Sequence, residues 1–145
     1  MNTSRLGSQR FVKRLVVQVR SFGTDNVPVP VDLGYDSSDP YAVTVCFQTG
    51  EAPVVWTFAR DLLVDGLGEP TGDGDVHVWP SLDDEGHAVV NLELTAPSGD
   101  ALAELRIDDL ADFVDRMHRL VPVGAESGHL DLDAVISALL PTESV

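Results

Sequence analysis

The chain has 145 residues, 43% of them hydrophobic, and a formal net charge of −15 at neutral pH. A chain of this length buries roughly 70% of its unfolded surface as one domain, so we expect it to fold without stabilisation by covalent cross-links or bound metal ions. Its single cysteine, Cys46, excludes an internal disulfide, and the sequence contains neither a leader-like segment nor a membrane-spanning apolar run. We therefore expect a cytoplasmic protein with no membrane insertion.

The charge is unevenly distributed along the chain. Residues 1–20 hold five of the nine basic side chains and carry +5, whereas all 24 acidic side chains lie at Asp25 or later, so that residues 21–145 carry −20. An acidic body repels phosphate backbones, because non-specific nucleic-acid affinity comes mostly from basic side chains that displace counterions. No nucleic acid is therefore expected as a partner.

The first elements are predicted to be strands. Residues 1–9 are expected to form a flexible tail before a single domain that spans residues 10–141. Alternating apolar side chains then predict a strand over residues 11–20. The segment 27–40 holds three prolines, and it is interpreted as an edge strand or an extended loop that ends in a turn. Clean alternation over residues 41–48 and 54–59 predicts two strands of one hairpin.

A glycine-rich stretch follows the hairpin, from Phe58 to Pro80. It begins with a short helix over residues 60–65, which Gly66 is expected to close in the left-handed conformation. The remaining glycines, Gly68, Gly72 and Gly74, are expected to allow a long bend before a strand over residues 75–80.

The last third of the chain changes from strands to helices. Residues 87–96 predict a strand, and residues 101–107 fit a strand or a helix, of which we favour the strand. A stripe of apolar side chains from Ile107 to Val121 predicts a helix that starts at Asp108, and residues 131–140 predict a second, shorter helix. The expected fold is α+β: a single domain with an antiparallel sheet of about six or seven strands and helices mainly at the C-terminal end.

Several kinds of chemical site were tested against these motifs. A phosphate-binding loop requires a lysine after its last glycine, but the only lysine is Lys13. The segment 73–84 lacks the glycine and the glutamate of a calcium loop. Two sets of possible metal ligands occupy alternate positions in the sequence: Asp73, Asp75 and His77; His129, Asp131 and Asp133. A turn at the first set and a helix cap at the second explain these residues more simply. We expect no catalytic residue, no cofactor and no metal, and hence no enzyme.

Four residues of the central stretch are candidates for a partner surface. Trp56 and Trp79 are interpreted as core or subunit-interface residues rather than ligand-stacking platforms. Arg60 and Asp61 follow a hydrophobic strand, where helix-capping and ion-pair roles are the simplest interpretation.

The amino-acid sequence of this region resembles that of a known family. The segments 28–50 and 54–80 closely resemble the SsgA-like sporulation and cell-division proteins of actinomycetes, most of all the SsgB type. The most distinctive residues cover about a third of the chain: Tyr35, Asp36, Asp39, Pro40 and Tyr41; the run from Phe58 to Leu63; Gly66, Pro70, Gly72, Gly74, Asp75, Val76, Trp79 and Pro80.

The resemblance implies a fold, a function and partners. It implies a whirly-like fold, a homotrimer, and a non-enzymatic protein that localises the septum during sporulation by recruiting the tubulin-like GTPase FtsZ, with FtsZ and other SsgA-like proteins as partners. Trp56, Arg60, Asp61 and Trp79 would then form or support the assembly or partner surface. An alternative is a whirly-type single-stranded nucleic-acid binder, in which the basic stretch from Arg10 to Arg20 lines a groove and Phe11 or Phe22 stacks on bases.

Overall fold

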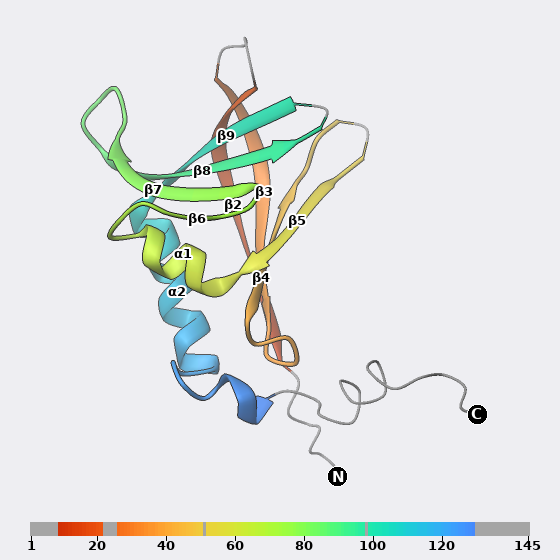
Figure 1. Cartoon of the computed structure of the whole chain (residues 1–145). Coiled ribbons are helices and arrows are strands. Elements are labelled where there is room, and N and C mark those ends of the chain that lie inside the picture. Colours follow the sequence, from red (N-terminus) through yellow and green to blue (C-terminus); the bar gives the residue numbers. More distant parts are fainter. Residues whose placement is uncertain (1–8, 22–25, 51, 98, 130–145) are drawn as a thin grey trace.

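The computed structural model describes residues 9–21, 26–50, 52–97 and 99–129 (Figure 1). In these ranges the chain forms one antiparallel sheet of eight strands, in the order β5-β4-β3-β2-β9-β8-β7-β6, with two α-helices on one of its faces. The fold is α+β as expected, although the sheet has eight strands instead of six or seven. The elements are β2 (Arg10–Ser21), β3 (Val27–Asp36), β4 (Ala42–Phe47), β5 (Val54–Ala59), α1 (Arg60–Gly66), β6 (Thr71–Asp73), β7 (Val76–Leu82), β8 (Ala88–Ala96), β9 (Gly99–Arg106), α2 (Ile107–Leu120) and a 3-10 turn (Glu126–His129).

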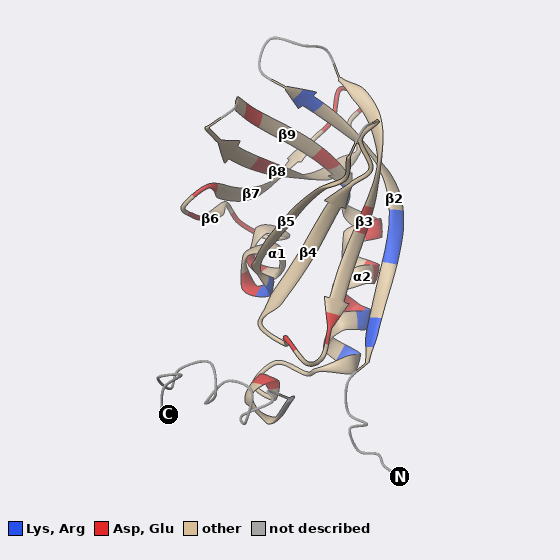
Figure 2. Ribbon diagram, turned by 90° about the vertical axis from the view of Figure 1, so that its right-hand side faces the viewer, with Lys and Arg blue, Asp and Glu red and all other residues tan. Residues whose placement is uncertain are grey.

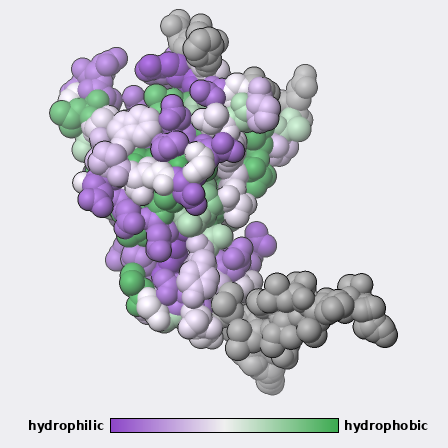
Figure 3. Space-filling model, in the orientation of Figure 1, coloured by the Kyte–Doolittle hydropathy of each residue, from purple (hydrophilic) through white to green (hydrophobic). Residues whose placement is uncertain are grey.

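A single hydrophobic core lies between the helices and the face of the sheet that we call the inner face. Alternate side chains of each strand point to this face, which is why the burial of β4 alternates strictly. Leu33 and Val78 are fully buried on the sheet side, and Leu110 and Met117 of α2 contribute to the same core from the helix side. Among the described residues, no helix lies over the opposite face, which we call the outer face (Figure 1). In the view of Figure 3, hydrophobic areas of the surface are interrupted by hydrophilic side chains.

The proline-containing strand β3 is central, which corrects the expectation of an edge strand or loop. It pairs with β2 on one side over its whole length, but β4 reaches only its second half, from Val31 to Gly34. The Pro30 carbonyl accepts a hydrogen bond from the N–H of Gln48, on the side of β4 and just beyond the end of that strand. A strand residue points its N–H and C=O to the same side, so the missing N–H groups of Pro28 and Pro30 face away from β2, on the side where the pairing with β4 has ended at Val31.

The glycines of the central stretch have other roles than the sequence predicts. Gly66 lies inside α1 and has no positive φ, so the left-handed closure expected there is wrong. A Cβ on Gly66 would lie 2.2 Å from Cγ1 of Val78, so this glycine is required for close packing of α1 on β7. Gly74, with φ of 61°, forms a two-residue turn with Asp75 that joins β6 to β7 in place of a long bend.

The helical predictions are confirmed where the structure describes the chain. α2 spans Ile107–Leu120, one residue from the expected start, and the ambiguous segment before it is strand β9. Acidic side chains lie in the first turn of α2 and basic ones in its last turn, which suits the helix dipole. The second helix expected over residues 131–140 lies outside the described residues. Among the residues described, no helix is long and apolar enough to cross a bilayer.

Candidate partner-binding surfaces

Arg60 is the most buried of the four candidate residues, with 1% of its surface exposed. It is the first residue of α1, and its backbone N–H donates to the carbonyl of Tyr41. Its guanidinium donates hydrogen bonds from Nη1 to the Tyr35 hydroxyl, at 3.0 Å, and to the Val121 carbonyl, at 2.9 Å. From Nη2 it donates to Oε2 of Glu126 at 2.7 Å, so that Arg60 joins strand β3 to the segment after α2.

The groups around Arg60 have altered electrostatics. The Glu126 carboxyl accepts hydrogen bonds from the backbone N–H of Glu126 itself and from the Arg60 guanidinium, and both lower its pKa. Burial raises the pKa of Tyr35, whose hydroxyl donates in turn to the carbonyl of Pro40 at 2.8 Å. Burial and the nearby charge of Arg60 both lower the pKa of His118. Because it is enclosed by these partners, Arg60 does not itself face solvent.

The sequence suggested ion-pair and helix-capping roles for Arg60 and Asp61. Arg60 forms an ion pair, but neither residue caps the helix. The N-cap of α1 is Ala59, which makes no side-chain cap hydrogen bond. Asp61 is exposed in the first turn of the helix, where a negative charge suits the dipole. Of the two neighbouring residues, Asp61 is therefore the one available to a partner.

Trp56 lies on β5, one of the two edge strands of the sheet. It faces inward opposite Val45 and is half-buried against the core. Its neighbours Val54 and Val55 are 46% and 58% exposed. A sheet edge with exposed apolar side chains is typical of an interface, because an uncovered edge readily pairs with another chain.

Trp79 lies on the opposite face of the sheet from Trp56. On β7 the buried residues Val76 and Val78 point inward, so Trp79, the next residue after Val78, points outward, where it is half-buried opposite Asn91. The Asn91 amide donates to the Ser81 hydroxyl at 2.8 Å. Arg60 and Asp61 therefore lie at the start of α1 and Trp56 on the strand that precedes it, whereas Trp79 lies on the other face of the sheet.

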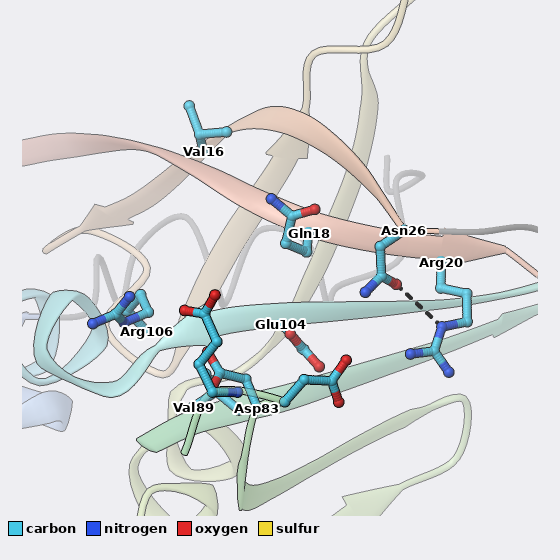
Figure 4. A pocket seen from close by; sticks show the side chains of 10 residues that line it. Val16, Gln18, Arg20, Asn26, Asp83, Val89, Glu104 and Arg106 are labelled. Atoms are coloured by element: carbon cyan, nitrogen blue, oxygen red, sulfur yellow. Dashed lines mark hydrogen bonds between the residues drawn. The ribbon is translucent and has the colours of Figure 1, made fainter. Parts of the chain in front are cut away.

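A hollow of about 440 Å³ lies on the outer face beside the β7–β8 turn (Figure 4). Its floor includes Val89 and Glu104, and its walls come from that turn and from the end of β2, where Arg20 Nε donates to Asn26 Oδ1. The N–H groups of His87 and Glu85 donate to Asp83 at the turn and lower its carboxyl pKa, so this acid holds the turn in place. We assign no partner to this mixed-charge hollow.

Two further sequence hypotheses concern metals and base stacking. The described residues contain no group of three or more His, Cys, Asp or Glu side chains placed to hold a metal, and Asp131 and Asp133 lie outside them. The His77 ring instead lies over Gly72, with Nδ1 at 3.8 Å from a Glu93 oxygen. Phe11 is 8% exposed and packs between Tyr35 and Phe113, so it presents no face to a base. Phe22 lies outside the described residues.

Comparison with known proteins places the chain in a family. Residues 29–126 match the family described as "Streptomyces sporulation and cell division protein, SsgA". This chain belongs to the SsgA family. The matched segment contains all four candidate residues and ends at Glu126, the ion-pair partner of Arg60.

Several related SsgA-family proteins carry the name SsgB. The "Sporulation-specific cell division protein SsgB" of Streptomyces coelicolor is 48% identical over 128 residues, which cover 88% of this chain and 90% of that protein. The protein of the same name from Saccharopolyspora erythraea is 48% identical over 119 residues, 81% of this chain and 83% of that protein. The chain is accordingly an SsgA-like protein of the SsgB type.

Solved structures of SsgA-like proteins share the fold. An SsgA-like sporulation-specific cell division protein from Thermobifida fusca matches with a TM-score of 0.81 and 35% identity, over 97% of this chain and 100% of that chain. A chain from work on mutations in SsgB and longitudinal cell division in Streptomyces coelicolor matches with a TM-score of 0.74 and 43% identity, over 83% of this chain and 97% of that chain. The chain thus has the fold of these proteins, and its similarity to sporulation-specific cell division proteins supports a role in cell division.

Proposed function

We propose that this protein recruits FtsZ to the site of the sporulation septum by direct contact and without catalysing a reaction. The observation that carries this proposal is the 48% identity, over 88% of the chain, to a protein named for sporulation-specific cell division. An adaptor of this kind needs a rigid scaffold with exposed surfaces, and a single sheet with one continuous core provides such a scaffold.

The junction of β5 and α1 supports the assembly part of this proposal. Val54 and Val55 are exposed at the start of this edge strand, one on each face, and Asp61 stands exposed beyond its other end, at the start of α1. Arg60 fixes that helix from beneath through its bonds to Tyr35, Val121 and Glu126. We propose that this junction mediates a homotrimer or contact with other SsgA-like proteins, and that the assembled protein presents repeated binding sites to an FtsZ filament.

Fluorescence microscopy in the sporulating organism tests the proposal. We expect the tagged protein to appear at future septum positions before FtsZ does, and we expect regular FtsZ rings to be lost when its gene is deleted and restored by the wild-type gene. Rings of normal number and spacing in the deletion strain would contradict recruitment. A strain that lacks an unrelated sporulation gene serves as the control for a general delay in development.

A further inference from the structure

Basic positions of the start of β2 and of the end of α2 lie on the same side of the ribbon (Figure 2), and they make up five of the nine basic residues of this acidic protein. Three come from the start of β2 and two from the last turns of α2, so that segments about a hundred residues apart contribute to one surface. We call this surface the basic rim: Arg10, Lys13, Arg14, Arg116 and Arg119. Its local charge is opposite to the net charge of −15 of the whole chain.

The basic rim surrounds an open strand edge inside the sheet. β2 pairs with β3 along Arg10–Val19 but with β9 only from Gln18 to Ser21. Among the described residues, no strand pairs with the other side of residues 10–17. Every second residue of an antiparallel strand points its N–H and C=O to the same side, so this edge carries backbone groups that can bind an incoming strand.

Hollows on both sides of Arg116 give room beside this edge. One, of about 350 Å³, is lined by Arg10, Arg119 and Leu120 among others, and a second, of about 450 Å³, is lined by Lys13 and Arg14 of β2 and by residues of α2. The Arg116 guanidinium lies 4.3 Å from the centre of the Phe11 ring, between the strand and the helix. Cationic side chains therefore flank the open edge from both the sheet and the helix.

The ion pairs of the rim decide which class of anion fits it. Lys13 has Asp112 at 3.7 Å, Arg119 has Asp115 at 3.3 Å and Arg14 has Asp32 at 2.6 Å. Within the described chain, Arg10 and Arg116 have no acidic group within 4.0 Å. The interspersed acids would repel a continuous row of phosphates or a flat anionic membrane, and the buried Phe11 cannot stack on a base.

We propose that the basic rim binds an extended acidic segment of a partner polypeptide, which adds as a strand to the open edge of β2. Strand addition supplies affinity through backbone hydrogen bonds, and the flanking side chains supply specificity. Carboxylates on alternate residues would meet Arg10 and Arg116 and avoid Asp112 and Asp115. This inference rests on the proposed function and deepens it, because it names the chemistry of the segment through which the recruited partner is held.

Fluorescence anisotropy with a labelled peptide of about twelve residues, glutamate at alternate positions, tests the rim directly. We expect saturable binding to the full chain that weakens as salt is raised. The double variant Arg10→Glu with Arg119→Glu should lose at least about ten-fold in affinity. The control is Arg20→Glu with Arg106→Glu, which makes the same change in charge at the other end of β2 and beside the hollow to which no partner is assigned. Equal affinities of the two double variants, or no saturable binding by the wild type, would overturn the proposal.

Two further measurements separate the alternatives. Bound peptide should slow amide hydrogen exchange in residues 10–17 of β2 and leave the edge strand β5 unchanged, and the absence of protection in β2 would overturn strand addition. Rim-dependent binding of a single-stranded oligonucleotide or of anionic vesicles in preference to the peptide would also overturn it, and would assign the rim to that other class.

The same variants in co-sedimentation with FtsZ polymers distinguish failure of this inference from failure of the proposed function. If the wild type and the rim variant both pellet with the polymers, the inference fails and recruitment stands. If the wild type binds the peptide but does not pellet, recruitment fails and the rim stands as an acidic-peptide site.

Discussion

The Arg60 guanidinium donates a 2.7 Å hydrogen bond to the Glu126 carboxylate, 66 residues further along the chain. Arg60 is 1% exposed, and the Glu126 side chain 13%. The pair fastens the 3-10 turn after α2 to the corner where β5 becomes α1, and the Tyr35 hydroxyl completes the connection from β3. The corner that carries Trp56 and Asp61 is thereby fixed by contacts far away in sequence.

Replacement of Arg60 by alanine should lower the free energy of unfolding by about 3 to 5 kcal/mol, because it leaves Glu126 and the Val121 carbonyl without their buried partner. Urea denaturation measures the change. Arg106→Ala removes an exposed arginine and should stay within about 0.5 kcal/mol of the wild type. Equal losses in the two variants would show that Arg60 has no special structural role.

The contribution of Glu126 to stability should depend on pH. The pKa of this carboxyl is lowered from its ordinary value of 4.5, so the folded state binds its proton less readily than the unfolded state does. The stabilisation is therefore complete above the ordinary pKa and is lost as pH falls through the lowered one. The difference in unfolding free energy between the wild type and Glu126→Gln should shrink steadily below about pH 4.5, and a difference that is constant with pH would argue against the ion pair.

Gly66→Ala should destabilise the protein by about 1 to 3 kcal/mol, because the added Cβ would overlap the Val78 side chain. Gly68→Ala is a matched control two residues away, where an added Cβ meets nothing within 4 Å and φ is not positive. The second substitution should be neutral or slightly stabilising. The additional substitution Val78→Ala should recover part of the loss in Gly66→Ala, and strictly additive losses would refute the proposed clash.

Substitution of each tryptophan tests a different surface for a role in assembly: Trp56 tests the β5 edge and Trp79 tests the outer face. If the β5 edge mediates a homotrimer, Trp56→Ala should lower the mass measured by light scattering, whereas Thr57→Ala, exposed on the outer face of the same strand, should keep it. Trp79→Ala tests the outer face in the same way. A native mass for both tryptophan variants, with folding confirmed by circular dichroism, would remove these side chains from the assembly surface.

Local patterns predicted most elements because their information is local. The alternation in residues 41–48 and 54–59 and the helical stripe of α2 correspond to β4, β5 and α2 within a few residues. The three-residue strand β6 was missed because its residues, Thr71–Asp73, carry no hydrophobic alternation. The central position of β3 was not predicted because prolines are typical of edge strands. The structure shows that only the first half of β3 has an unpaired edge, since β4 is too short to reach it.

The candidate surfaces could not be predicted from local sequence patterns, because they depend on how the fold brings distant segments together. Nothing near Arg60 in sequence indicates Glu126 as its partner, since the two meet only when α2 returns toward the β5 corner. The positive charge of residues 1–20 indicates the part of the basic rim that lies on β2, but nothing in the sequence indicates that the cations at the end of α2 share a surface with it. The placement of α2 beside the open part of β2 unites the two sets.

Co-sedimentation with FtsZ from the same organism, assembled with GTP at physiological salt, tests the central claim most directly. Unassembled FtsZ with GDP is the control, and the protein must be shown to be folded beforehand. The proposed recruitment predicts saturable pelleting with polymers only. Folded protein that stays in the supernatant at every polymer concentration would contradict direct recruitment of the division filament.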